Sequence, residues 1–347
     1  MKKFSIILIA SIVFIIGACE NQEKVFPDYD YTAVYFPIQF PVRTLSLGED
    51  RVDNSLDREL KFHIGTVIGG MYANKWDWQV NFELAPSLAE NVSTSTGMAI
   101  KMLPPEYYTM TPSNSVTIPN GKLNGLIQIQ LKDEFLDDPL AIGHHYVIPL
   151  RIISTTADSI LTGLPAISNP DKRVASHWDA NAMPRDFTLF MIKYVNPFHG
   201  YYLRRGVTYK LNAAGEKVDT VVYRNQFVER DQVVSLTTKG RNKVHAGFTG
   251  TDFGFGFGLN LTIEESGVVQ IDSVAGERSA GYGFGESRYL KNGERWGGLN
   301  HDAMYLQYRY FDRNRVRYEV FDTIVFRDRG LKFEEFIPVV EGIEGEK

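Results

Sequence analysis

The sequence predicts an all-β protein with an N-terminal immunoglobulin-like β-sandwich, followed by a second β-rich domain with a curved or barrel-like sheet. Apolar and polar residues alternate at period two in runs such as 60–67, 78–84 and 126–131, as they do in half-buried strands. Turn signals such as Pro119-Asn120-Gly121 separate the runs. About seven such runs with scarcely a helical pattern favour a sandwich for the first domain.

Length and composition indicate a folded protein of about two domains. The chain has 347 residues, of which 44% are hydrophobic and 13% aromatic, enough for packed cores. We expect a signal peptide at 1–18, a tether at 19–34, the sandwich at 35–155, a linker at 156–185 and the second domain at 186–340.

The second domain is expected to open with a long strand at 187–194 and to close with strands at 305–310 and 318–328. Between them, residues 252–260 place Phe253, Phe255 and Phe257 on one face and glycines on the other. Glycines on one face of a strand allow a close approach or a strong bend. We interpret this run as barrel curvature, with a ligand surface as the alternative.

The N-terminus reads as an export signal. Lys2 and Lys3 precede an uncharged, mostly apolar run at 4–16, which is too short to span a bilayer. The segment ends in Gly17-Ala18-Cys19 and resembles the lipobox of bacterial lipoproteins, whose cysteine is acylated and becomes the mature N-terminus. An ordinary signal peptide with a chance cysteine is the alternative. Because Cys19 is the only cysteine, no intramolecular disulfide can form, and with Cys19 acylated no thiol remains for a metal site or a nucleophile.

The charge and the tether indicate where the protein works. A net charge of −5 argues against nucleic acid as a partner, since nucleic acid requires a basic field. The acidic residues after Cys19 resemble the signal that sends Bacteroidetes lipoproteins to the outer surface, and a plain solvated linker is the alternative. We therefore expect a lipid-anchored protein of the outer membrane that is exposed at the cell surface, with a periplasmic orientation as the alternative.

Two pairs of motifs carry a resemblance to a known family. Residues 102–110 and 145–152 resemble the N-terminal β-sandwich, of unknown function, of Sus-type surface lipoproteins and of some family 18 endoglycosidases. Residues 196–202 and 322–330 resemble the C-terminal domain that often follows it. The resemblance implies a SusE-like protein of a polysaccharide-utilisation system, which captures glycan beside a SusC/SusD-like transporter. Leu103, Tyr107 and Tyr108 are expected to be structural.

The sequence contains no catalytic motif that we recognise. The alternating aspartates that precede the family 18 acid are absent, as are Gly-x-Ser-x-Gly and His-Glu-x-x-His. His144 and His145 would point to opposite faces of a strand and make a poor metal pair. Asp133, Asp137 and Asp138 fit a charged loop better than a calcium site. We therefore predict neither an enzyme nor a cofactor.

Glycan binding is the leading hypothesis, because aromatic faces flanked by polar groups recognise sugars. The candidates are Trp296 with Arg295, Asn300 and Asp302 as polar neighbours, then Trp76, which would share a strand face with Trp78, and Trp178. Trp178 lies in the linker and fits a domain–domain seam better than a platform. The alternative function is a structural adhesin or pilus-type subunit that assembles through strand edges, and an unrecognised hydrolase is a third.

Overall fold

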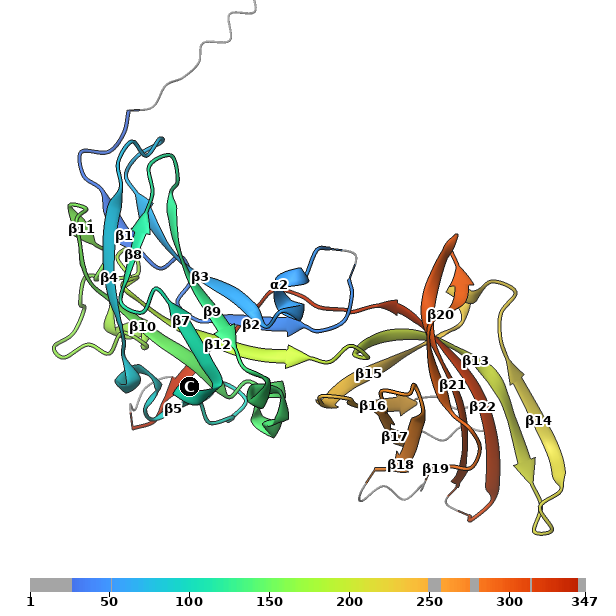
Figure 1. The fold of residues 1–347 in the computed structure, drawn as a ribbon. Coiled ribbons are helices and arrows are strands. Elements are labelled where there is room, and N and C mark those ends of the chain that lie inside the picture. The colour runs from blue at the N-terminus through green and yellow to red at the C-terminus, as the bar shows by residue number, and fades with distance from the viewer. Residues whose placement is uncertain (1–26, 51, 249–256, 275–280, 313, 343–347) are drawn as a thin grey trace, which may run out of the picture.

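The computed structural model describes residues 27–50, 52–248, 257–274, 281–312 and 314–342. These residues form two β-rich domains side by side, which confirms the predicted all-β class (Figure 1). The predicted signal peptide, Cys19 and most of the tether lie outside the described residues. Within the described part of the chain, no helix is long and apolar enough to cross a membrane.

The first domain is a sandwich of two sheets. One has the order β11-β1-β3-β9-β7 and the other the order β23-β2-β12-β10-β4-β8, with β6 beside β10. The strands are β1 (Ala33–Tyr35), β2 (Pro41–Ser46), β3 (Lys61–Gly69), β4 (Trp78–Leu84), β6 (Lys101–Met102), β7 (Tyr108–Thr111), β8 (Ser115–Ile118), β9 (Asn124–Leu131), β10 (Tyr146–Thr155), β11 (Ser159–Ile160), β12 (Phe187–Val195) and β23 (Glu334–Glu335). Side chains such as Ile64, Phe82 and Ile127 fill the space between the sheets and are fully buried.

Strand β12 is a correction to the predicted domain boundary. Residues 187–194 were expected to open the second domain, but β12 lies in the sandwich, antiparallel to β10 and parallel to β2. Ile192 and Tyr194 pack into the core between the sheets, whereas Leu189 and Met191 pack on the other face with Phe336. A strand covered on both faces is apolar throughout, so its pattern could not show which sheet it joins.

The outer face of that sheet is covered by segments distant in sequence. A ladder of β5 (Val92–Thr94) with β24 (Pro338–Val340) brings the C-terminal segment onto the sandwich. Residues 159–160 of the predicted linker also join the sandwich, because β11 pairs with β1. The helical segments are short and are α2 (Ser55–Arg58), η1 (Pro86–Ala89), η2 (Pro105–Tyr107), η3 (Asp133–Asp137), η4 (Pro139–Ile142), η5 (Ala175–His177) and η6 (Val228–Arg230).

The second domain is a nearly closed antiparallel barrel of order β18-β17-β16-β15-β13-β22-β21-β19, with β14 beside β13 and β20 beside β21. The strands are β13 (Gly200–Leu211), β14 (Lys217–Tyr223), β15 (Gln232–Gly240), β16 (Lys243–Phe248), β17 (Phe257–Ile263), β18 (Val269–Ser273), β19 (Gly281–Gly283), β20 (Arg288–Trp296), β21 (Leu299–Phe311) and β22 (Arg317–Asp328). Val269 N–H donates to Ser287 O at 2.9 Å and joins the two ends of the sheet. The predicted barrel-like sheet is thus confirmed.

Glycine and aromatic residues shape the barrel. A Cβ at Gly281 would overlap the buried side chain of Leu259, so glycine lets β19 approach β17 closely. Of the three phenylalanines predicted to share a face, Phe253 and Phe255 lie outside the described residues. Phe257 points into the barrel and stacks on Tyr310, with ring centroids 4.5 Å apart. This contact favours a packed interior at Phe257.

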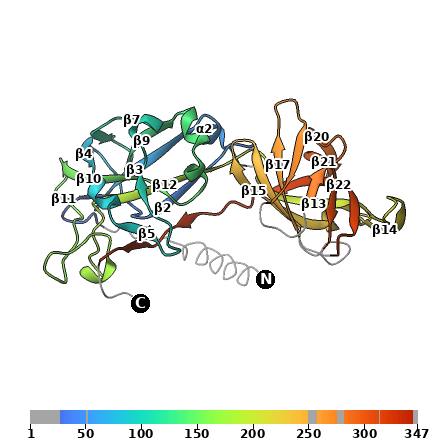
Figure 2. The ribbon, with the colours of Figure 1, turned by 90° about the horizontal axis from the view of Figure 1, so that it is seen from below.

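The chain crosses between the domains twice, first from β12 to β13 and then back after β22, as Figure 2 shows from below. Arg329, on the second crossing, donates from Nη1 to His199 O at 2.9 Å and from Nη2 to Glu49 O at 3.0 Å. Lys291 Nζ pairs with Glu49 at 2.9 Å, and Arg241 Nε pairs with Asp137 at 3.1 Å. The junction is therefore fixed mainly by polar contacts.

Candidate functional site

A groove of about 580 Å³ lies on the sandwich beside the domain junction. Its walls are β2, Asp50 with residues 52–57, which include most of α2, and residues 331–333 of the returning chain. In Figure 1, α2 and its loop stand beside β2 between the two domains, and the chain after β22 passes next to them. The lining includes Ile38, Arg43, Asp53, Asn54, Phe190 and Phe333. Its volume is in the range of small-ligand sites.

Hydrogen bonds hold the polar wall of the groove in place. Asp57 is buried, and its Oδ1 pairs with Arg43 while its Oδ2 accepts from the backbone N–H of Ser46 at 3.0 Å. Asn54 Nδ2 donates to the carbonyls of Ser46 at 3.0 Å and Gly48 at 2.6 Å. These bonds tie the loop before α2 to the end of β2. The wall is therefore preformed rather than assembled by a ligand.

Apolar side chains line the opposite wall and the rim. Phe333 is 70% exposed, and Val52 and Leu56 are exposed as well. Phe190 is half-buried and stacks on Phe62 with centroids 5.6 Å apart and planes 8° apart. The groove thus combines an accessible aromatic ring with amide, carboxylate and guanidinium groups, which suits a ligand with apolar faces and hydroxyl edges.

Two of the three carboxylates that line the groove, Asp53 and Asp57, do not have the environment of a glycosidase acid. Hydrogen bonds from Ser55 lower the pKa of Asp53, whereas a general acid requires a raised pKa. Both oxygens of Asp57 are engaged by Arg43 and the Ser46 backbone. Elsewhere in the described residues, no group of three histidine, cysteine, aspartate or glutamate side chains could hold a metal.

Trp296, the first of the predicted glycan-binding residues, ends strand β20 and is half-buried. Its Nε1–H donates to Phe326 O at 3.3 Å, and its ring stacks on His301 at 4.4 Å, so one face is covered. Arg295 and Asn300 are exposed cross-strand partners on the same hairpin. These contacts are those of a residue that pins a hairpin to the barrel.

Asp302 lies on β21 and is engaged within the protein. It accepts hydrogen bonds from Tyr289 Oη and, at 2.9 Å, from Asn292 N–H. The first of these bonds, together with burial, raises the pKa of Tyr289. The structure brings Arg295, Asn300 and Trp296 together, whereas the carboxylate of Asp302 is used to order the turn at Asn292.

The other two tryptophans differ sharply in exposure. Trp76 is 67% exposed and lies before β4, so it does not share a strand face with Trp78, whose Nε1 donates to Asn74 Oδ1 at 2.8 Å. Trp178 is only 8% exposed, and its Nε1 donates to Asp171 O at 2.7 Å. Trp178 packs inside the folded linker against Gly163, so it has no free face for a sugar and does not fill a seam between the domains.

The remaining motif residues have structural roles. Leu103 and Tyr108 are buried in the sandwich core, as expected, and Tyr107 donates to Asp138 at 3.1 Å. His144 Nε2 lies 3.0 Å from Glu334, which binds the C-terminal segment to the sandwich. Sequence reasoning missed the groove, because residues 331–333 lie far in sequence from the lining residues at 38–57, and an exposed phenylalanine in a coil gives no local signal.

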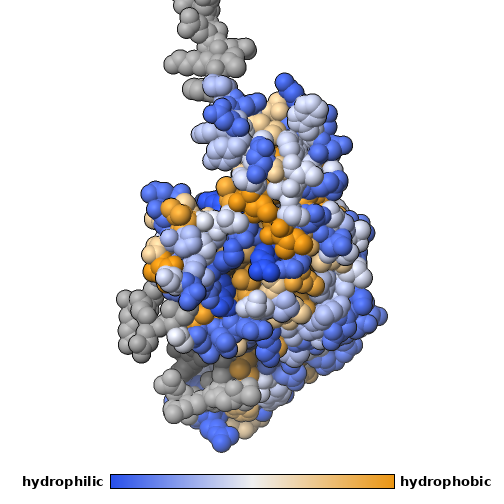
Figure 3. Space-filling view, turned by 90° about the vertical axis from the view of Figure 1, so that its left-hand side faces the viewer, coloured by the Kyte–Doolittle hydropathy of each residue, from blue (hydrophilic) through white to orange (hydrophobic). Residues whose placement is uncertain are grey.

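The surface of the sandwich is of mixed polarity. On the face shown in Figure 3, apolar side chains form several small groups between hydrophilic ones. Exposed apolar residues of the first domain include Ile153, Leu164 and Ile167. Scattered groups of this kind are ordinary for a protein surface.

Comparisons with known proteins agree with the two-domain division. Residues 29–159 match a family model described as "-like, N-terminal domain", and residues 197–330 match the "Domain of unknown function (DUF5627)". The chain gives no significant match among curated proteins.

Three solved structures from Bacteroides ovatus are similar to the chain. One, described as of unknown function, is 32% identical with a TM-score of 0.80 over 91% of this chain and 100% of its own. Another of unknown function is 11% identical with a TM-score of 0.35 over 78% of this chain and 85% of its own. The third, described as a "putative carbohydrate binding protein", is 14% identical with a TM-score of 0.29 over 82% and 83%. The chain therefore belongs to the two-domain family of the first of these proteins, with a DUF5627 domain as its second part.

Proposed function

We propose that this protein is a non-catalytic glycan-binding protein, anchored to the outer membrane through acylated Cys19, with both domains outside the cell. In this proposal it captures oligo- or polysaccharide beside a SusC/SusD-like transporter of a polysaccharide-utilisation system. The lipobox-like end of the signal segment supports the anchor. The observation that supports the binding function is the preformed groove, which exposed Phe333 and the hydrogen-bonded Asn54 both line.

The groove suits a sugar better than a fully apolar ligand. A pyranose ring offers an apolar face for stacking, and Phe333 supplies an aromatic ring. Its hydroxyl edge requires donors and acceptors, which Arg43, Asp53 and Asn54 supply. The lowered pKa of Asp53 keeps this carboxylate ionised at neutral pH, where it accepts hydrogen bonds but cannot act as a general acid.

A glycan array tests this proposal, with residues 20–347 as the probe. The Phe333→Ala variant should bind the best glycan about tenfold more weakly, the loss expected for one stacking contact of about 1.4 kcal/mol. Ile337→Ala is the matched control, because Ile337 is 69% exposed on the same returning segment but does not line the groove. Trp296→Ala, tested alongside, should retain binding. Absence of any bound glycan, or equal loss in Phe333→Ala and Ile337→Ala, would overturn the groove as the site.

The alternative, assembly through a strand edge, has one observation in its favour. In the described chain β14 pairs only with β13, and Val218 and Val222 are exposed on it. A free edge can add a strand from another chain. Lys217 and Asp219 place charge on this strand, and charge is a usual means of blocking such pairing. Concentration-dependent polymers in sedimentation, abolished by Val222→Lys, would favour assembly over glycan capture.

A further inference from the structure

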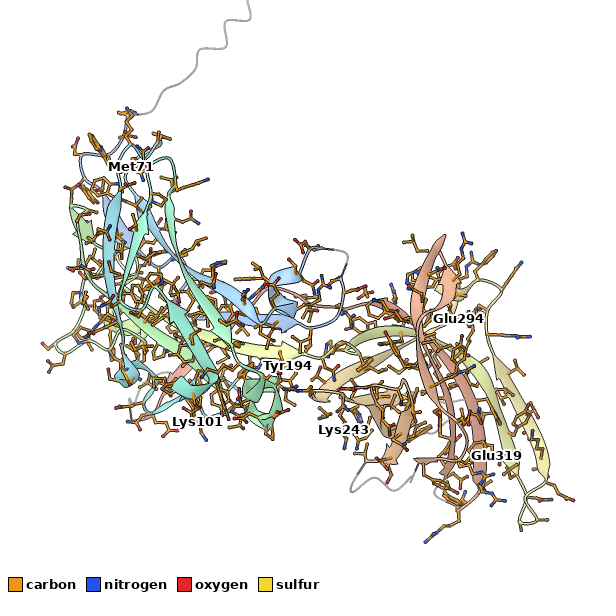
Figure 4. The ribbon with its side chains drawn as sticks, viewed as in Figure 1. Met71, Lys101, Tyr194, Lys243, Glu294 and Glu319 are labelled. Carbon is orange, nitrogen blue, oxygen red and sulfur yellow. The ribbon has the colours of Figure 1, made fainter. Side chains whose placement is uncertain are left out.

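Four aromatic side chains are exposed at one end of the sandwich. They are Tyr29, Tyr31, Tyr72 and Trp76, with exposures of 78%, 57%, 67% and 67%. Figure 4 labels Met71 at this end, where the described chain begins and which lies away from the second domain. We name Tyr29, Tyr31, Tyr72 and Trp76 the aromatic end.

The aromatic end is ordered by hydrogen bonds between its segments. Tyr29 N–H donates to Gly70 O at 2.9 Å, and Tyr72 N–H donates to Asp28 Oδ1 at 2.7 Å. Trp76 N–H donates to Asn74 Oδ1 at 3.0 Å. The bonds at Asp28 and Gly70 join the start of the described chain to the loop after β3. The segments that carry Tyr29, Tyr72 and Trp76 are therefore fixed at this end of the sandwich, and Tyr31 follows Tyr29 by two residues.

Asn74 supports this surface from within. It is buried, and its Nδ2 donates to Pro119 O at 3.0 Å and to Lys122 O at 2.8 Å. Asn120 Nδ2 donates to Lys75 O at 3.1 Å. The loop that carries Tyr72 and Trp76 is thus fixed to the neighbouring turn, although their rings face solvent.

The chain length outside the structure limits where this surface can be. Only seven residues, 20–26, lie between Cys19 and Pro27, so the two residues are at most roughly 30 Å apart even when this segment is fully extended. If Cys19 is acylated, as the proposed function holds and as this inference requires, Pro27 and the adjoining aromatic end lie within roughly 30 Å of the bilayer. The second domain lies away from that end (Figure 1).

The chemistry of the surface fits the interfacial zone of a bilayer. Tyrosine and tryptophan concentrate at the depth of the headgroups, because their rings are apolar and their O–H and N–H groups are polar. Asp28, Asp30, Lys75 and Asp77 are beside them in the sequence, Lys122 lies in the turn bound by Asn74, and Arg185 lines the same cavity as Tyr31. These charges nearly cancel, so binding would not depend on anionic lipid.

We propose that the aromatic end rests in the interfacial zone of the membrane to which the protein is anchored. The acyl chains supply the affinity, and the aromatic end sets the orientation. With this end against the bilayer, the second domain is held away from the membrane. Trp76 contributes a contact with lipid in this arrangement.

The test uses the mature acylated protein, residues 19–347, in phosphatidylcholine vesicles whose acyl chains carry bromine, a short-range quencher of tryptophan fluorescence. The wild type should lose emission relative to vesicles without bromine. The Trp76→Phe variant should lose much less. Trp296→Phe is the matched control and should be quenched like the wild type, because it keeps Trp76.

Each outcome separates this inference from the proposed function. Mass spectrometry of the mature N-terminus shows first whether Cys19 carries acyl chains. An acylated protein whose emission does not respond to bromine, or a Trp76→Phe variant quenched as strongly as the wild type, would overturn the membrane contact alone. An unacylated Cys19 would overturn both the anchor and the contact, whereas glycan binding by the groove is measured independently of either.

Discussion

Inside the barrel, a buried ion pair between Arg204 and Asp322 makes the sharpest prediction about stability. Arg204 Nε donates to Asp322 Oδ2 at 2.8 Å, and the two side chains are 1% and 0% exposed. Tyr308 Oη also donates to Asp322 at 2.7 Å, and Arg204 Nη2 donates to Tyr223 Oη at 3.0 Å. The Asp322→Asn change keeps the shape but leaves the guanidinium buried without its counter-charge.

Breaking such a pair by neutralising one partner costs about 3–5 kcal/mol. In a domain of this size each kcal/mol lowers Tm by roughly 2–6 °C, so a loss on the order of 10 °C or more is expected. Differential scanning calorimetry of Asp322→Asn measures it. Asp328→Asn is the matched control on the same strand, because its pair with Arg327 is 3.5 Å long and about 40% exposed and should contribute less than about 1 kcal/mol. Equal, small shifts in both variants would refute the reasoning.

Two further predictions concern the junction and the barrel seam. Burial lowers the pKa of His199 to about 4, with Arg329 and Lys193 adding to the effect. The unfolded chain then binds the proton more readily, so stability should fall as pH drops from about 6.5 to about 4, by roughly 2 kcal/mol or less after allowance for partial exposure. Urea unfolding at pH 7 and pH 4.5 measures this decrease in stability, which should be smaller in the His199→Gln variant than in the wild type. An identical decrease in the two proteins would contradict the role of His199. Gly281→Ala should lower the free energy of unfolding by about 1–3 kcal/mol, because the added Cβ would overlap Leu259. Gly283→Ala, whose Cβ would lie 3.5 Å from Ile271, should cost less. Equal decreases in Tm for the two variants would argue against close packing of β19 on β17.

The period of the sequence pattern identified most strands but not their partners. In β3 the burial alternates strictly between half-buried and buried residues, so the pattern reports one covered face. In β12 nearly every residue is buried, because the core lies on one face and the C-terminal segment on the other. A run of buried residues of this kind indicates only that the strand is covered on both faces. Its assignment to the first domain required the long-range pairing with β2, which no local pattern encodes.

Candidate binding residues were harder to predict because exposure depends on tertiary contacts. Trp178 and Trp76 both occur in polar stretches of sequence, yet one is buried against Gly163 and the other faces solvent. Phe333 drew no attention, since a single phenylalanine in an irregular segment is usually core. The chain returns over the sandwich at this point, and it is Phe336, three residues later, that packs against the sheet and is buried. Phe333 is left exposed.

The second crossing of the chain also links the barrel to the groove. Arg329 is 5% exposed and is held by the carbonyls of His199 and Glu49, with its guanidinium 4.5 Å from the ring of Phe326. It therefore fixes the start of the segment whose residues 331–333 form one wall of the groove. The opposite wall begins just after Glu49, which is the residue that Arg329 and Lys291 bind. Contacts with the barrel therefore hold both walls of the groove. The barrel positions the groove, although the sandwich supplies most of the residues that line it.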